Sequence, residues 1–139
     1  MGSSYQPAGA HLLADFYGVD ASRLADCTAI ELLLYDAALA ANARIVHSHF
    51  HAFGEGKGVT GVLLLAESHI SIHTWPEFGF AAADIFMCGS ATPEGALEVI
   101  RQALEPVSVK LQIVARGQAT DPIMAEQGSL RAKAQFDDT

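Results

Sequence analysis

An apolar run over residues 62–66 (Val-Leu-Leu-Leu-Ala) leads directly into a polar stretch over residues 67–77. The run is short and has no polar side to place in solvent, so it predicts a central strand that is buried on both faces. The polar stretch gathers histidines, hydroxyls, carboxylates and a Trp-Pro pair into eleven residues. Because a buried strand holds the groups that follow it rigidly, this junction is the first candidate for a reactive site.

The rest of the chain carries strand and helix patterns in turn. Strands are predicted over residues 11–17, 44–53, 59–66, 70–74, 80–87 and 107–113. A capping box of Thr28 and Glu31 predicts the start of one helix, and Thr92 followed by Pro93 predicts the start of a second. The glycine-rich residues 54–58 predict a hairpin turn between two strands.

The predicted order is strand, helix, four strands, helix, strand. This order is typical of an α+β two-layer sandwich, with a mostly antiparallel sheet and helices on one face. Half of the residues are hydrophobic and only 17% are charged. We therefore expect the other face of the sheet to be apolar and to be buried against a second copy of the chain.

The length of 139 residues suits one domain that builds its own core. A net charge of −8 argues against a nucleic-acid partner, which requires clustered Lys and Arg. No apolar segment reaches the length of about 18 residues that suggests a membrane span, and the first residues do not resemble a secretory signal. Cys27 and Cys88 make no disulfide framework, so we expect a cytoplasmic protein with free thiols.

Three histidines, His47, His49 and His51, alternate along one predicted strand and so share one of its faces. Imidazoles on one face suggest zinc, whereas the simpler interpretation is a solvated or hydrogen-bonded stripe. Because the three positions spread over about 13 Å, one tetrahedral ion cannot easily take all of them. We expect no metal.

A hydrolase and a thiol enzyme can also be drawn from the residue types. Ser68, His73 and Asp84 would supply a catalytic triad, but no G-x-S-x-G elbow surrounds the serine. Cys88 and His73 would supply a thiol–imidazole pair, although a lone cysteine is more often a small core residue. Neither arrangement is favoured by the residues alone.

Residues 67–69 (Glu-Ser-His) and 71–77 (Ser-Ile-His-Thr-Trp-Pro-Glu) closely resemble the self-processing segment of the S-adenosylmethionine decarboxylases, in their short prokaryotic pyruvoyl-dependent form. Other stretches also match that family: residues 11–17, 50–53 and 82–89. The resemblance implies an antiparallel α/β sandwich that pairs into a four-layer αββα homodimer with its sites at the interface.

The chain divides into three parts. The patterns at the two ends of the chain predict a flexible N-terminus (residues 1–10) and a C-terminal tail without periodicity (117–139), and between them the resemblance implies a decarboxylase domain (11–116). The resemblance also implies a proenzyme that cuts itself into a β chain of residues 1–67 and an α chain of residues 68–139.

The resemblance assigns roles to individual residues. The cut falls between Glu67 and Ser68, and Ser68 becomes a covalent pyruvoyl cofactor that forms a Schiff base with the substrate amine. His73 matches the proton acceptor in processing, and Cys88 matches the proton donor in decarboxylation. Thr60 stands where the family has the serine of a G-V-S-G motif, and its hydroxyl would hold the processing intermediate.

The implied substrate is S-adenosylmethionine, whose decarboxylated product supplies aminopropyl groups for spermidine synthesis. By resemblance, Phe53 would stack on the adenine and Glu77 would hold the ribose hydroxyls. The same pyruvoyl chemistry also serves ornithine or arginine in related enzymes, and the processing motif does not separate these substrates. The partners implied are therefore a small-molecule substrate and a second copy of the chain, with no membrane, nucleic acid or metal.

Overall fold

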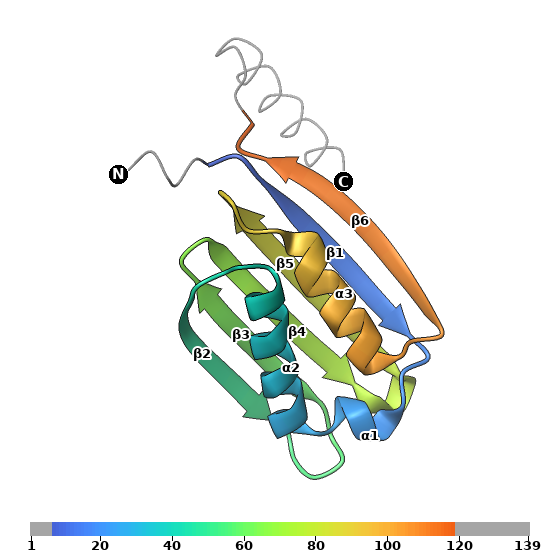
Figure 1. The fold of residues 1–139 in the computed structure, drawn as a ribbon. Coiled ribbons are helices and arrows are strands. Elements are labelled where there is room, and N and C mark those ends of the chain that lie inside the picture. The colour runs from blue at the N-terminus through green and yellow to red at the C-terminus, as the bar shows by residue number, and fades with distance from the viewer. Residues whose placement is uncertain (1–6, 119–139) are drawn as a thin grey trace, which may run out of the picture.

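The computed structural model describes residues 7–118. Their elements, in chain order, are β1 (Gly9–Tyr17), α1 (Ala21–Leu24), α2 (Cys27–Ala40), β2 (Ile45–Ala52), β3 (Val59–Leu65), β4 (Ser68–Trp75), the 3-10 helix η2 (Pro76–Phe78), β5 (Phe80–Cys88), α3 (Pro93–Leu104) and β6 (Ser108–Arg116). The strands form one six-stranded sheet in the order β2-β3-β4-β5-β1-β6, and each neighbouring pair is antiparallel. Helices α2 and α3 lie side by side across one face of this sheet (Figure 1). The predicted α+β two-layer sandwich is confirmed.

The core lies between the sheet and these two helices. Successive side chains of a strand point to opposite faces, so every second residue of the central strands is buried under the helices. The largest fully buried side chains come from both layers: Phe16, Leu12, Leu24, Ile30, Leu34, Leu63, Ile70, Ile72, Ile85, Met87, Ile100 and Leu104. The intervening residues of each strand occupy the face without helices.

The helix starts differ in part from those predicted. Helix α2 begins at Cys27, and Asp26 caps it by accepting the Ala29 N–H at 3.0 Å. The capping box of Thr28 and Glu31 is therefore wrong, because the helix starts before Thr28. Thr92 is confirmed at the N-cap position of α3, although its side chain makes no capping hydrogen bond. None of the helices in residues 7–118 is long and apolar enough to cross a membrane.

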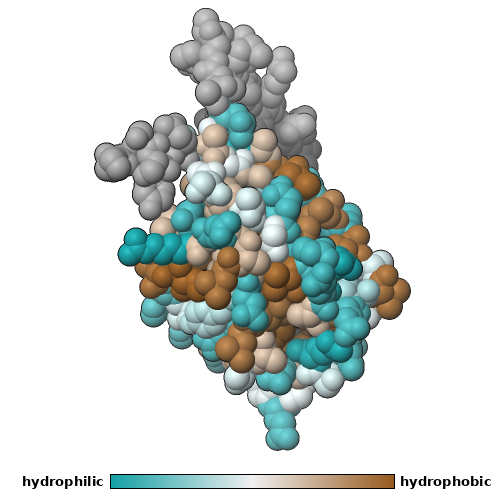
Figure 2. All heavy atoms as spheres, viewed as in Figure 1, coloured by the Kyte–Doolittle hydropathy of each residue, from teal (hydrophilic) through white to brown (hydrophobic). Residues whose placement is uncertain are grey.

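Strands β3 and β6 are less buried than their sequences predict. Strand β3 is internal but second from the edge, and Leu64 is 46% exposed on the face without helices. Strand β6 is the edge strand beyond α3, so Leu111 and Ile113 remain 42% and 57% exposed. Hydrophobic residues reach the surface on that side in Figure 2. The alternation of apolar residues over 107–113 predicts a half-buried strand, whereas the structure makes it an exposed edge.

The predicted terminal segments fall mostly outside the described residues. Strand β1 begins at Gly9, two residues before the predicted start, since Gly9 and Ala10 pair with Cys88 and Met87 of β5. The tail predicted from residue 117 lies outside the structure from residue 119 onward.

Thr74 joins three elements at the end of the sheet that carries the candidate site. Its buried hydroxyl accepts the Val59 N–H at 2.8 Å and donates to the Leu24 carbonyl at 2.7 Å. Thr74→Val leaves both backbone groups buried without a partner, so we expect a loss of about 2–3 kcal/mol in the free energy of unfolding. Urea denaturation of the uncleavable Ser68→Ala chain measures this loss. Thr92→Val is the matched control and changes stability by less than about 0.5 kcal/mol.

Candidate active site

The face of the sheet without helices carries all six histidines of the chain: His11, His47, His49, His51, His69 and His73. The strand register puts His47, His69 and His11 in one row across the sheet, with Leu64 and Phe86 between them. The predicted stripe on β2 is therefore one edge of a wider imidazole-rich surface. Within residues 7–118 no three His, Cys, Asp or Glu side chains gather closely enough to hold a metal ion.

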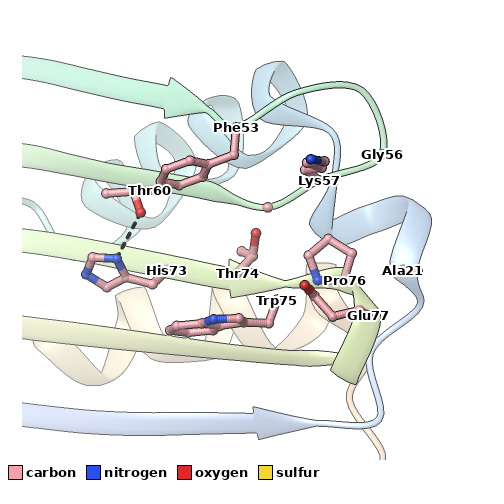
Figure 3. A pocket seen from close by; sticks show the side chains of 11 residues that line it. Ala21, Phe53, Gly56, Lys57, Thr60, His73, Thr74, Trp75, Pro76 and Glu77 are labelled. Atoms are coloured by element: carbon pink, nitrogen blue, oxygen red, sulfur yellow. Dashed lines mark hydrogen bonds between the residues drawn. The ribbon is translucent and has the colours of Figure 1, made fainter.

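A pocket of about 650 Å³ opens at one end of this face, where β2, β3 and β4 meet the 3-10 helix (Figure 3). Its lining residues are Ala21, Phe53, Gly56, Lys57, Gly58, Thr60, His73, Thr74, Trp75, Pro76 and Glu77. Thr60 and His73 are cross-strand partners, and the Thr60 hydroxyl lies 3.1 Å from His73 Nδ1. This hydrogen bond fixes the orientation of the imidazole and leaves its Nε2 atom free for proton transfer.

The pocket has one aromatic side and one charged side. Phe53 is 58% exposed at its rim, and the Trp75 ring lies 6.3 Å from the His73 ring. Glu77 stands in the first turn of the 3-10 helix, and Lys57 comes from the loop between β2 and β3 (Figure 3). Aromatic faces suit a nucleobase, and a carboxylate suits the hydroxyls of a sugar.

The glycine-rich turn is a hairpin loop, as predicted, and it folds closely over β4. A Cβ atom on Gly58 would lie 2.1 Å from the Thr74 carbonyl oxygen, so only glycine allows this approach. The chain then enters β3 one residue later, which brings Thr60 opposite His73.

A second polar cluster surrounds the Glu67–Ser68 peptide bond at the other end of β4. The Glu67 carbonyl oxygen accepts two hydrogen bonds from Cys88, one from its thiol at 3.0 Å and one from its backbone N–H at 3.3 Å. The Glu67 side chain accepts the backbone N–H of Arg44 at 2.9 Å. Ser68 itself has a φ of +154°, which residues with a side chain rarely adopt. The bond predicted to be cut therefore lies in a strained and tightly held segment.

The two clusters are separate within one chain. Ser68 and His73 are five residues apart on one strand, which corresponds to about 16 Å. Cys88 is six residues along β5 from Ala82, the partner of His73, which corresponds to about 20 Å. The thiol–imidazole pair of Cys88 and His73 is therefore wrong for a single chain.

The triad of Ser68, His73 and Asp84 is also wrong within one chain. Asp84 pairs with Ser71 in the middle of the sheet, and its carboxylate lies 3.3 Å from His11 Nε2. Burial and the neighbouring His11 lower the pKa of His69, which Asp84 partly opposes. Asp84 thus belongs to an imidazole cluster and has no contact with Ser68.

Sequence reasoning missed several residues of both clusters. The sequence gives Trp75 no role beyond its place in the polar stretch and Lys57 none beyond its place in the glycine-rich turn, yet both line the pocket. Arg44 takes part through its backbone N–H, for which no side-chain signal exists in the sequence.

Comparisons with known proteins give a consistent family. The sequence profile of the S-adenosylmethionine decarboxylase family matches residues 10–117. The S-adenosylmethionine decarboxylase proenzyme of Sulfurihydrogenibium sp. is 46% identical over 110 residues, which cover 78% of this chain and 82% of that protein. The proenzyme of Aquifex aeolicus is 44% identical over 110 residues, which cover 78% of this chain and 81% of that protein.

A solved structure extends the agreement to the fold. The crystal structure of the adenosylmethionine decarboxylase from Aquifex aeolicus superposes with a TM-score of 0.76 at 42% identity, covering 84% of this chain and 96% of that one. The match takes in both polar clusters, since the profile spans Phe53 to Cys88. The resemblance first drawn from residues 67–77 is confirmed, and the chain belongs to the S-adenosylmethionine decarboxylase family.

Proposed function

We propose that the chain is a proenzyme that cleaves itself between Glu67 and Ser68 and then decarboxylates S-adenosylmethionine. The observation that carries this proposal is the pair of Cys88 donors on the Glu67 carbonyl, next to a serine in a strained backbone conformation. The names of the relatives at 42–46% identity support S-adenosylmethionine as the substrate.

The cleavage begins as an intramolecular acyl shift. Ser68 Oγ bonds to the Glu67 carbonyl carbon, and the carbonyl oxygen takes up negative charge next to the two Cys88 donors. The carbon–nitrogen bond then breaks, the Ser68 nitrogen takes up the proton that the hydroxyl lost and becomes a free amine, and an ester remains. Loss of the Ser68 α-proton expels the main-chain carboxylate of Glu67. Water then converts the resulting dehydroalanine into a pyruvoyl group and ammonia.

His73 suits the removal of the α-proton, because an imidazole is an effective base near neutral pH. In the tautomer in which Nδ1–H donates to the Thr60 hydroxyl, Nε2 carries the free lone pair and acts as the base. A distance of about 16 Å separates this base from Ser68 in its own chain. We propose that a partner subunit supplies the imidazole, and that the site is complete only in a homodimer.

The face without helices supports such a dimer. Within residues 7–118 no helix lies on it. It carries the His73 pocket at one end, and at the other end it carries Cys88, which contacts the Glu67–Ser68 peptide. A two-fold axis near Ser71, in the middle of β4, would lay the Ser68 end of one sheet over the His73 end of the other. Two sheets in face-to-face contact lie about 10 Å apart, which facing side chains can bridge. The result is a four-layer αββα homodimer with two identical composite sites.

A pyruvoyl group at residue 68 would supply the electron sink for loss of carbon dioxide from an attached amino acid. The residues around it fit that chemistry. The Cys88 thiol points toward residue 67–68 and can deliver a proton to the substrate carbon. Phe53 and Glu77 of a partner subunit would hold the adenine and the ribose at the open pocket. An interface between the two sheets that excludes water would keep other proton donors away from the substrate carbon.

The substrate test compares three amino acids labelled at the carboxyl carbon. We expect the processed protein to release labelled carbon dioxide from S-adenosylmethionine, with kcat/KM at least about a hundredfold above that for ornithine or arginine, because neither has an adenosine group to fill the pocket. Release from ornithine or arginine alone would overturn the proposed substrate. The uncleaved Ser68→Ala chain is the control and releases no label from any of them.

A further inference from the structure

The hairpin between β3 and β4 has an unusual turn. Leu65 pairs with Ser68, so the turn consists of only Ala66 and Glu67. Two-residue hairpin turns favour types I′ and II′, which need a positive φ within the turn and usually contain Gly or Asn. Neither Ala66 nor Glu67 has a positive φ, whereas Ser68, the next residue, does. A type I′ or II′ turn would place the positive φ within the turn. Here the positive φ falls on Ser68, the first residue after the turn.

Strained backbone persists only where its surroundings hold it. Two anchors hold this segment, one on each side of the turn. The Cys88 donors fix the Glu67 carbonyl, and the start of β2 fixes the turn through Arg44. The Arg44 backbone acts in both directions, because its carbonyl accepts the Ala66 N–H at 2.8 Å and its N–H donates to Glu67 Oε1 at 2.9 Å.

We infer that the Glu67 side chain is a positioning residue for self-cleavage, which holds the strained Glu67–Ser68 peptide against the Cys88 donors by accepting the Arg44 N–H. The inference rests on the proposed self-cleavage. It gives a role to the side chain of Glu67, whose main-chain carboxylate is the leaving group. Glu67 acts before the cut and through the backbone of a neighbouring strand. Once the peptide bond is broken, its hydrogen bond no longer affects the reacting atoms.

The inference predicts a defect in cleavage alone. Glu67→Ala removes the acceptor, and we expect the rate of conversion from intact chain to fragments to fall about tenfold, as for the loss of one positioning hydrogen bond. Glu67→Gln keeps an oxygen at the same reach and should cleave within about threefold of the wild-type rate. Glu67→Asp keeps the charge but shortens the side chain, and should be as slow as Glu67→Ala. Glu55→Ala, an exposed glutamate outside both clusters, is the matched control.

Three measurements separate positioning from a general loss of structure. Cleavage is followed on denaturing gels, turnover is expressed per titrated pyruvoyl group, and stability is measured by urea denaturation in the Ser68→Ala background. We expect slow cleavage of Glu67→Ala with unchanged turnover per pyruvoyl group. Cleavage of Glu67→Ala or Glu67→Asp at the wild-type rate would overturn the inference about Glu67 but not the proposed function. Cleavage of Glu67→Gln as slowly as Glu67→Ala would do the same. A wild-type chain that never cleaves would overturn the proposed function as well.

Discussion

Replacement of Ser68 by alanine leaves the chain intact at 139 residues, whereas the wild-type chain separates on a denaturing gel into fragments of 67 and 72 residues. The variant lacks the hydroxyl that attacks the Glu67 carbonyl, and the Cys88 thiol, which contacts that carbonyl in the described structure, donates a hydrogen bond to its oxygen and does not face the carbon as a nucleophile must. A positioned internal nucleophile is worth an effective concentration of about 10⁵ M or more, so cleavage stops rather than slows. The larger wild-type fragment also resists N-terminal sequencing, because a pyruvoyl group has no amine.

Ser71→Ala is the matched control for this result. Ser71 lies on the same strand, three residues on, and pairs with Val62 and Asp84 in the middle of the sheet. It does not reach the Glu67 carbonyl, so the variant should cleave normally. Cleavage of Ser68→Ala at the same bond would show that another group performs the attack and would refute the role assigned to Ser68.

The fold was predictable from sequence because its strands carry either period-two patterns, as in β2, β4 and β6, or an apolar run, as in β3, with clear turns between them. The hairpin at residues 54–58 and the start of α3 at Pro93 follow from local glycine and proline chemistry. The start of α2 did not, because Asp26 and Thr28 are both good caps and only the packing of the helix selects between them. The exposure of β6 depends on how far α3 reaches across the sheet, which no local pattern encodes.

The candidate site was predictable as a set of residues but not as an arrangement. The residues Ser68, His73 and Cys88 are recognisable from their sequence context, which led to the family. Their separation follows from strand geometry, since residues 68 and 73 lie on one extended strand. The anchors of the turn were also hidden, because Arg44 contributes its backbone and the strain at Ser68 arises from the turn before it. Sequence motifs therefore group side chains that lie far apart within a single folded subunit.

That separation makes the proposed composite site directly testable with two inactive chains. The Ser68→Ala chain keeps His73, and the His73→Ala chain keeps Ser68. In a mixed dimer, one site combines Ser68 with the partner's His73 and is complete, while the other lacks both. We therefore expect each variant alone to remain uncleaved and a co-expressed mixture to recover both cleavage and decarboxylation.

The fraction of chains that recovers cleavage has an upper limit, and a second pair of variants is the negative control. Random pairing places about half of the His73→Ala chains in mixed dimers, so about half of them should be cleaved, and the Ser68→Ala chains never. Differently tagged chains show on one gel which of the two is cut. Ser68→Ala mixed with Cys88→Ala should recover no decarboxylation, because Ser68 of β4 and Cys88 of β5 lie at the same end of the sheet in one subunit and no mixed site contains both. If Ser68→Ala and His73→Ala fail to complement although tag capture shows mixed dimers, each site must lie within one subunit, and β4 must rearrange to bring His73 to Ser68.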